Sequence, residues 1–379
     1  MTKLGAEDHP LLQPKKMGQR RILSFDGGGI RGVLTLGMLE HLEKRLKTRL
    51  KVNDNFRLSD YFDFVGGTST GAILAAGVSL GKSVAELIAF YRESGALMFD
   101  KQFITKRLYA TYKDEPLRDK LKEVFGDTTK LGGPLLKSLL LVVMRNVTTD
   151  SPWPVTNNPM AKYNARDRDD CNLDLPLWQL VRASTAAPVY FPPEVVNIGK
   201  RTFVFVDGGV TPYNNPAFLL YRKVATDPYC LNWETGEDKL LILSFGTGSR
   251  PALGPDAAGA DRNLFQIASN IASEMMNGMA YDQDINCRSV GRCTFGAVLD
   301  REVGDMVVLP ARETKRQFTY ARYDPPLDRQ GLDELGFKGV DPEKVSKLDS
   351  VSAIDDLLAI GREYGKRYVL PEEHFPGFI

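Results

Sequence analysis

Residues 61–80 read YFDFVGGTSTGAILAAGVSL, which is the most informative pattern in the sequence. An apolar run leads through Gly67-Thr68-Ser69-Thr70-Gly71 into a segment of small and apolar residues. The order is typical of a buried strand, a very sharp turn and a helix, and such a turn needs small residues two positions before and after its serine. The stretch therefore predicts that Ser69 stands exposed at the carboxyl end of a strand, as a candidate nucleophile. The alternative is an accidental turn rich in glycine and serine.

Short apolar runs alternate with longer amphipathic stretches on both sides of this turn. The expected strands are 21–25, 61–65, 138–147, 202–206 and 239–245, and the expected helices are 34–50, 71–80, 84–91, 117–124, 177–184, 213–224 and 264–276. The helix 34–50 is the clearest, because leucine or methionine recurs every four residues and lysine and arginine occupy the other face. This alternation predicts an α/β fold with a mostly parallel central sheet.

Composition and charge exclude several classes of protein. The 379 residues include 49 lysines and arginines against 48 acidic residues, so no overall field draws the chain to a nucleic acid polymer. Apolar runs such as 139–144 are shorter than the roughly 18 residues that cross a bilayer. Residues 1–19 lack the features of a secretion signal, so we expect a cytoplasmic protein. The four cysteines have neither the spacing nor the histidine partners of a metal site, so we expect no metal.

A second glycine-rich turn, Asp26-Gly27-Gly28-Gly29-Ile30-Arg31-Gly32, also joins an expected strand to an expected helix. Glycines here let backbone N–H groups point at a bound or developing anion near a helix N-terminus. Two other interpretations compete. Gly27, Gly29 and Gly32 fit the GxGxxG pattern of dinucleotide sites, but the acidic residue expected about 20 positions later falls in a segment rich in lysine and arginine. The other is a tight turn without a ligand.

A serine nucleophile needs a base, and the histidines are poorly placed to supply it. His9 and His374 lie in the two terminal segments, and His41 sits roughly 15 Å along its helix from the glycine turn. Asp207 follows the expected strand 202–206 and opens Asp207-Gly208-Gly209, at a strand end of the kind where catalytic residues of parallel sheets gather. Asp207 is therefore the candidate base, and a turn or helix-capping role is the alternative.

Taken together, DGGGIRG at 26–32, GTSTG at 67–71 and DGG at 207–209 resemble the motifs of the patatin-like phospholipases, in the same order. Three further segments extend the resemblance, which covers roughly residues 20 to 250: 182–188, 214–216 and 243–248. The resemblance implies a patatin-like fold, in which helices cover both faces of a mostly parallel sheet as a three-layer α/β/α arrangement.

The resemblance also implies a role for each motif residue. Ser69 would attack an acyl ester carbonyl, and Asp207 would take the proton of its hydroxyl. The backbone N–H groups of Gly27, Gly28 and Gly29 would form the oxyanion hole, to which Arg31 adds positive charge. The remaining motif glycines are Gly32, Gly67, Gly71, Gly208 and Gly209. This chemistry requires neither a metal nor a cofactor.

The chain is expected to divide into unequal parts. Residues 1–19 form a polar N-terminal tail, residues 20–221 form the catalytic domain, and residues 239–248 complete its sheet. Residues 251–379 form a C-terminal elaboration that packs on the catalytic domain. No internal repeat is present.

The implied activity is that of a lipid acyl hydrolase of the phospholipase A type. It would act on membrane glycerophospholipids by transient association with the inner face of the membrane, without an anchor. Some soluble bacterial members of this family are switched on by a cyclic oligonucleotide in antiphage (antiviral) defence. A loose cluster suits such a ligand by charge and stacking: Arg288, Arg292, Arg312, Arg316, Tyr320, Arg322 and Tyr323.

Two alternatives to a phospholipase stay open. One is a nucleotide-binding or sensor module without hydrolysis, and the other is an esterase of small soluble esters. The sequence also leaves open the head-group preference, the acyl position that is cleaved and the oligomeric state.

Overall fold

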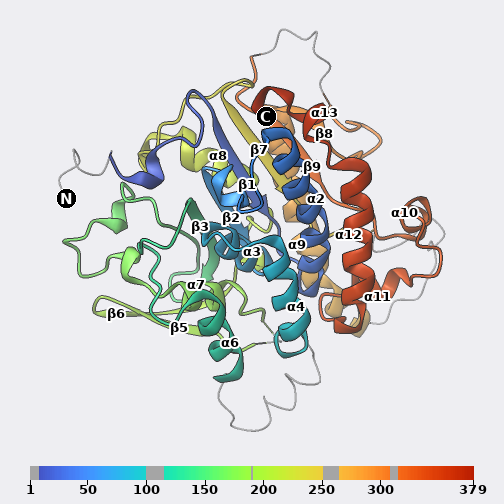
Figure 1. Ribbon diagram of the computed structural model, residues 1–379. Coiled ribbons are helices and arrows are strands. Elements are labelled where there is room, and N and C mark those ends of the chain that lie inside the picture. Colours follow the sequence, from blue (N-terminus) through green and yellow to red (C-terminus); the bar gives the residue numbers. More distant parts are fainter. Residues whose placement is uncertain (1–7, 100–114, 189–190, 251–263, 308–314) are drawn as a thin grey trace.

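The structure, a computed structural model, describes residues 8–99, 115–188, 191–250, 264–307 and 315–379 (Figure 1). One sheet forms the centre of this part, in the strand order β5-β6-β3-β2-β1-β7-β9-β8, with β4 paired to β3. The strands are β1 (Arg20–Phe25), β2 (Phe64–Thr68), β3 (Leu139–Asn146), β4 (Ser151–Thr156), β5 (Glu194–Ile198), β6 (Arg201–Asp207), β7 (Leu240–Phe245), β8 (Arg292–Phe295) and β9 (Thr319–Tyr323). The strands from β3 through β2, β1, β7 and β9 to β8 pair in parallel, whereas β4, β5 and β6 pair antiparallel. The expected mostly parallel α/β sheet is confirmed.

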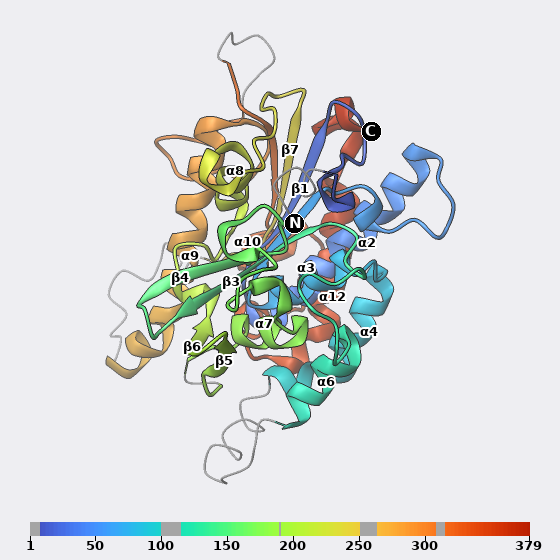
Figure 2. The same ribbon diagram turned by 90° about the vertical axis from the view of Figure 1, so that its left-hand side faces the viewer.

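Helices cover both faces of the sheet, as the side view in Figure 2 shows. One face carries α2 (Gly32–Leu50), α3 (Thr70–Ser79), α4 (Val84–Phe99) and α12 (Ile354–Tyr368), and the other carries α8 (Ala217–Ala225) and α9 (Leu264–Val290). The remaining helices are α6 (Glu115–Phe125), α7 (Leu177–Ser184), α10 (Arg329–Glu334), α11 (Pro342–Ser346) and α13 (Pro371–His374). The three-layer arrangement is therefore present. Among the described residues, no helix has the length and apolar character needed to span a membrane.

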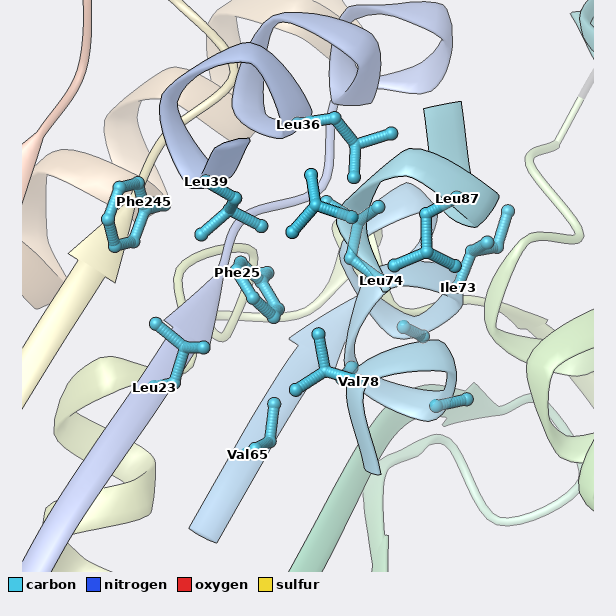
Figure 3. Close-up of a cluster of buried hydrophobic side chains, with 14 of the residues drawn as sticks. Leu23, Phe25, Leu36, Leu39, Val65, Ile73, Leu74, Val78, Leu87 and Phe245 are labelled. Carbon is cyan, nitrogen blue, oxygen red and sulfur yellow. The ribbon is translucent and has the colours of Figure 1, made fainter. Parts of the chain in front are cut away.

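The central strands divide their side chains between two hydrophobic cores. Leu23 and Phe25 of β1 pack in the core under α2 and α3, whereas the preceding residue, Ile22, packs in the core under α8. Figure 3 shows the first core, where Leu39 of α2 and Leu74 of α3 surround Phe25. Strands buried on both faces read as continuous apolar runs, which is why the sequence of β1 and β3 does not alternate. Both cores fix the carboxyl ends of β1 and β2 next to each other.

Strand β2 differs from the expected range. It covers Phe64–Thr68 rather than 61–65, because two glycines that resemble a turn in the sequence are part of the strand. A Cβ atom on Gly66 would lie 2.8 Å from a methyl carbon of Leu220 in α8. A glycine inside a strand often marks such a close approach. A side chain on Gly66 would displace Leu220, so the glycine lets α8 pack directly on the strand.

The C-terminal third of the chain joins the same sheet and both of its helical layers. Strand β9 pairs with β7 over five residues, from Leu241 opposite Thr319 to Phe245 opposite Tyr323. Helix α12 packs along α2, where a Cβ atom on Gly361 would lie 2.1 Å from the carbonyl oxygen of Leu34. Helix α9 also continues to Val290, well beyond the expected end at 276. The division into a catalytic domain and an elaboration stays a prediction.

Candidate functional site

Ser69 lies in the sharp turn between β2 and α3, with a backbone φ of 55° and ψ of −123°. A positive φ is uncommon for a residue with a side chain, and it indicates local strain that the surroundings must hold. The Ser69 N–H donates a hydrogen bond to Ser184 Oγ at 2.9 Å, and that hydroxyl donates to the Val143 carbonyl at 2.6 Å. The end of α7 and strand β3 thus fix the turn that presents the serine.

The glycines on either side of Ser69 allow the strand and the helix to touch. A Cβ atom on Gly67 would lie 2.0 Å from the Gly71 carbonyl oxygen, and one on Gly71 would lie 2.4 Å from the Phe25 carbonyl oxygen. Both distances fall inside van der Waals contact with backbone, which cannot rotate away. The two glycines of the motif are therefore needed because β1, β2 and α3 pack in direct backbone contact.

Replacing Gly67 by alanine is expected to lower the free energy of unfolding by about 3 kcal/mol, because the added methyl group overlaps backbone in a closed core. Urea denaturation followed by circular dichroism measures this change. Gly339→Ala is the matched control, since a Cβ atom there has no neighbour within 4 Å. Equal stability of the two variants would contradict the packing argument.

Asp207 stands at the end of β6 and accepts a hydrogen bond from Ser69 Oγ, at 2.6 Å to Oδ2. Its other oxygen, Oδ1, accepts from the Gly209 N–H at 2.6 Å. Both Ser69 and Asp207 are buried, with exposures of 7% and 5%. The expectation that Asp207 ends a parallel strand is wrong, because β6 runs antiparallel to β3. The register still brings the two residues together, since Thr68 lies opposite Val143 and Asp207 lies opposite Met144.

The surroundings of Asp207 make its carboxylate a better proton acceptor. Burial raises the pKa of the Asp207 carboxyl to about 6, although the hydrogen bonds from Ser69 and Gly209 and the charge of Arg182 oppose the rise. Arg182 is fully buried in α7, and its Nη2 donates to the Pro192 carbonyl at 3.2 Å. A carboxyl with a pKa near neutrality exchanges protons more readily than an ordinary aspartate.

The glycine-rich turn lies beside Ser69, but its three N–H groups are not equivalent. A Cβ atom on Gly27 would lie 3.3 Å from Ser69 Cβ, so the two residues are in contact. The Gly27 N–H already donates to the Asn214 carbonyl at 3.1 Å. For Gly28 and Gly29, the described part of the chain offers no acceptor for the N–H group. Within the described residues, two of the three predicted donors therefore have no hydrogen-bond partner.

The buried side chain of Arg31 stabilises the glycine-rich turn through hydrogen bonds to backbone carbonyls. Its side chain is 5% exposed, with Nε donating to the Gly28 carbonyl at 3.4 Å and Nη1 to the Gly248 carbonyl at 3.0 Å. On the outer side, the Ile30 N–H donates to the Leu348 carbonyl at 2.9 Å, and Gly29 adopts a φ of +60° beside it. The predicted positive charge near the turn is present, and it also holds the turn in shape.

The three histidines have partners away from Ser69 and Asp207. His9 Nδ1 accepts from the Leu11 N–H, His41 Nε2 accepts from Arg45, and His374 Nδ1 shares a hydrogen bond with the Tyr323 hydroxyl. Burial lowers the pKa of His374 to about 4, which keeps it neutral. The choice of a carboxylate as candidate base therefore agrees with the placement of every histidine.

The arginines and tyrosines of the C-terminal cluster do not form one open basic pocket. Arg288 and Arg322 are buried and paired with aspartates, and Tyr320 and Tyr323 lie fully buried in β9. Arg292 pairs with Glu237, Arg316 donates to a backbone carbonyl, and Arg312 lies outside the described residues. The sequence brought these residues together by type, whereas the fold uses most of them internally.

A polar cavity of about 360 Å³ opens beside the glycine-rich turn. Its lining includes Gly27 and Arg31 from the turn, and Arg250 and Tyr281 from the C-terminal part. Two arginines of the predicted cluster, Arg288 and Arg322, also line it, together with three aspartates: Asp26, Asp284 and Asp324. Ser69 and Asp207 are not among the lining residues. The cavity therefore touches the backbone of the candidate site without containing the candidate nucleophile.

Sequence reasoning missed several residues that hold this site. Ser184, Arg182 and Asn214 lie in segments that contributed to the resemblance, yet no role could be predicted for them individually. The signal was there in the motifs, but only the folded backbone shows which atoms they contact.

Comparisons with known proteins agree with the motifs. The family model described as "Patatin-like phospholipase" matches residues 23–221. Patatin-1-Kuras 2 from Solanum tuberosum is 31% identical over 252 residues, which are 60% of this chain and 62% of the patatin. A cGAMP-activated phospholipase from Vibrio cholerae is 29% identical over 288 residues, 71% of this chain and 76% of that protein. The chain thus spans less than two thirds of the length of the patatin.

Among solved structures, VipD from Legionella pneumophila matches with a TM-score of 0.36 and 14% identity, over 90% of this chain and 67% of that one.

Proposed function

Because the chain belongs to the patatin-like phospholipase family, we propose that it is a lipid acyl hydrolase that cleaves fatty acyl esters of membrane glycerophospholipids with a dyad of Ser69 and Asp207. The observation that carries the proposal is the 2.6 Å hydrogen bond from Ser69 Oγ to Asp207 Oδ2. It joins a nucleophile on a strained turn to a buried carboxylate, which is the arrangement that activates a hydroxyl.

In the first half of the reaction, Ser69 Oγ attacks the acyl carbonyl carbon while Asp207 Oδ2 takes the hydroxyl proton. The tetrahedral oxyanion accepts hydrogen bonds from the Gly28 and Gly29 N–H groups. Gly27 contributes only if its N–H leaves the Asn214 carbonyl. When the intermediate collapses, the lysophospholipid oxygen leaves with the proton from Asp207, and the acyl group stays on Ser69.

In the second half, water attacks the acyl-enzyme carbonyl and gives its proton to Asp207. The same N–H groups stabilise the second oxyanion. Collapse breaks the bond to Ser69 Oγ, which recovers the proton, and the fatty acid leaves. Preorganised donors of this kind typically contribute ~10²–10³ each to the rate.

The proposal assigns the catalytic domain to residues 20–221, with 239–248 completing its sheet and 251–379 as an elaboration packed on it. Residues 1–19 are the N-terminal tail. The enzyme meets its substrate by transient contact with the inner face of the membrane from the cytoplasm.

The proposed regulation is activation by a cyclic oligonucleotide in bacterial antiphage defence. Two observations support it. The Vibrio cholerae relative is described as cGAMP-activated, and the cavity beside the glycine-rich turn is lined by arginines and a tyrosine. Arg31 and Arg250 offer positive charge to phosphates, and Tyr281, at 37% exposed, offers a ring for stacking. A ligand there would contact the turn that carries the oxyanion donors.

Fatty-acid release from mixed phospholipid vesicles tests the proposal, with calcium chelated and with a panel of cyclic di- and trinucleotides added singly. Release is expected from the wild type and not from Ser69→Ala or Asp207→Ala. Arg250→Ala and Tyr281→Ala are expected to weaken activation by the nucleotide and to leave unstimulated release unchanged.

A parallel assay with a short water-soluble ester separates the alternatives. Turnover of that ester without vesicle hydrolysis would replace the phospholipase by a soluble esterase. Nucleotide binding without turnover of either substrate would replace the hydrolase by a sensor module.

A further inference from the structure

Arg322 of β9 holds Asp26, the first residue of the glycine-rich turn, with both ends of its guanidinium. Nη1 lies 3.2 Å from Asp26 Oδ1, and Nη2 lies 2.8 Å from Asp26 Oδ2. The side chains are 6% and 4% exposed, and both line the polar cavity beside the glycine-rich turn. Such two-point pairs fix orientation as well as distance. Arg322 lies about 100 residues beyond the end of the family match at residue 221.

Strand order explains how a side chain from β9 reaches the end of β1. Strand β7 lies between them, with Ser24 opposite Ser244 and Ser244 opposite Arg322. The Arg322 side chain passes the small Ser244 and donates to its Oγ at 2.8 Å on the way to Asp26. A larger residue at position 244 would occupy that path.

Arg322 is itself held from the other side by a buried charge network. Its Nε lies 3.6 Å from Asp284 Oδ2 of α9, and its Nη2 lies 3.2 Å from Asp324 Oδ2. Asp284 also accepts from Arg288, at 2.9 and 2.6 Å, and from the Tyr320 hydroxyl at 3.0 Å. The guanidinium therefore has little freedom to leave Asp26.

The main chain of Asp26 is directly connected to the candidate site, so a displacement of Asp26 would also displace residues of the site. Its N–H donates to the Phe245 carbonyl at 3.0 Å, and a Cβ atom on Gly71 would lie 2.7 Å from its carbonyl oxygen. The next two residues are Gly27, in contact with Ser69, and Gly28, whose N–H has no acceptor in the described part of the chain. Asp26 thus connects the end of the β1–β7 pairing to the candidate oxyanion donors next to Ser69.

We propose that Arg322 is a positioning residue, which holds Asp26 and thereby sets the Gly28 and Gly29 N–H groups at the place where the oxyanion forms over Ser69. The inference rests on the proposed hydrolase function. It makes strand β9, outside the family match, part of the apparatus that stabilises the transition state.

Arg322 favours the charged form of Asp26. Burial raises the pKa of the Asp26 carboxyl to about 7, and Arg322 is the main group that opposes the rise. Without Arg322, the buried Asp26 carboxylate would have no positive partner and would stay uncompensated or take up a proton. In either case, the contact that orients Asp26 is lost.

The test compares Arg322→Met and Arg322→Lys with Arg21→Met. Arg21 is a matched control, because it is a buried arginine near the start of β1 whose guanidinium donates to the Tyr61 and Phe378 carbonyls. We expect Arg322→Met to lower kcat on a short water-soluble ester by about 10²-fold with KM within about threefold, as for the loss of an oxyanion donor. Arg322→Lys keeps the charge but not the two-point geometry, so about a tenth of the wild-type kcat should remain.

Arg21→Met is expected to lower the melting temperature while kcat per folded molecule stays within about threefold of the wild type. An equal loss of kcat in Arg21→Met and Arg322→Met would show general destabilisation and overturn the proposal. Wild-type kcat in Arg322→Met would overturn it as well.

Hydrogen exchange separates this inference from the proposed function. The Asp26, Gly27 and Ile30 amides are all hydrogen-bonded in the turn, and their exchange should quicken at least tenfold in Arg322→Met but not in Arg21→Met. If the wild type hydrolyses no ester, the proposed function fails, and the exchange rates still decide whether Arg322 holds the turn. Unchanged exchange in Arg322→Met would overturn the positioning role even in an active enzyme.

Discussion

Replacing Ser69 by alanine is expected to lower kcat for acyl ester hydrolysis by about 10⁴-fold or more. Alanine removes the only atom of the side chain that can form the acyl-enzyme, and water would then have to attack the ester without a covalent intermediate. The residual rate comes from the oxyanion donors and from substrate binding, which the variant keeps. Fatty-acid release and single-turnover kinetics measure the loss.

The fold should survive this substitution, because alanine fits wherever serine does at the same backbone angles. Ser79→Ala is the matched control, since Ser79 is also a buried serine of α3, and its hydroxyl donates to the Ser138 carbonyl at 3.0 Å. We expect that control to keep wild-type kcat. A serine-reactive phosphonate should label the wild type and the control but not Ser69→Ala. Hydrolysis by Ser69→Ala at more than a hundredth of the wild-type rate would contradict the assignment of the nucleophile.

Replacing Asp207 by asparagine is expected to lower kcat by about 10³-fold, in line with the loss of a general base. The amide keeps the shape of the carboxyl, and its oxygen can still accept from the Gly209 N–H. It cannot take the Ser69 proton. Asp63→Asn serves as the control, because Asp63 is a buried carboxyl that accepts from the Arg21 N–H, and we expect it to change stability without changing kcat per folded molecule.

The pH dependence gives a second readout of Asp207. Its pKa of about 6 means that the carboxyl is a base above pH 6 and mostly protonated below it. We expect kcat/KM of the wild type to be level above pH 7 and to fall about tenfold for each unit below pH 6. The residual activity of Asp207→Asn should lack this fall. A wild-type profile that stays level down to pH 4 would exclude Asp207 as the base.

Stability should change in the opposite direction to activity. The pKa of Asp207 is raised on folding, so its protonated form stabilises the fold at low pH, and this contribution is lost as the pH rises through about 6. At pH 8, Asp207→Asn is therefore expected to raise the free energy of unfolding by roughly 2 kcal/mol, and at pH 4 to leave it nearly unchanged. Urea denaturation at the two pH values measures the difference.

The sequence predicted the two residues that the structure brings together, Ser69 and Asp207. Gly67 and Gly71 frame Ser69 because backbone atoms meet there, and that contact leaves the same mark in any chain with such a turn. Asp207 followed from the lack of a suitable histidine. The nearly continuous apolar runs at β1, β3 and β7 marked strands buried on both faces.

What the sequence could not show depends on pairing between distant segments. The antiparallel direction of β6 follows from its register on β3, and local sequence does not encode which neighbour a strand chooses. The sequence predicted the Gly27 N–H as an oxyanion donor, but this N–H donates to the carbonyl of Asn214, almost 190 residues later. The sequence predicted a ligand-binding role for Arg322. Its buried partner, Asp26, lies 296 positions earlier, so the pair cannot be recognised before the chain is folded. Charged residues reveal their partners only in the folded chain.

The central position of β1 also determines when the protein can fold during its synthesis. Strand β1 pairs with β2 on one side and with β7 on the other, from Arg20 opposite Leu240 to Phe245 opposite Phe25. Until residue 245 has left the ribosome, the nascent chain carries an apolar strand with an open edge, which is prone to pair with other chains. Fragments released early should therefore aggregate and be degraded.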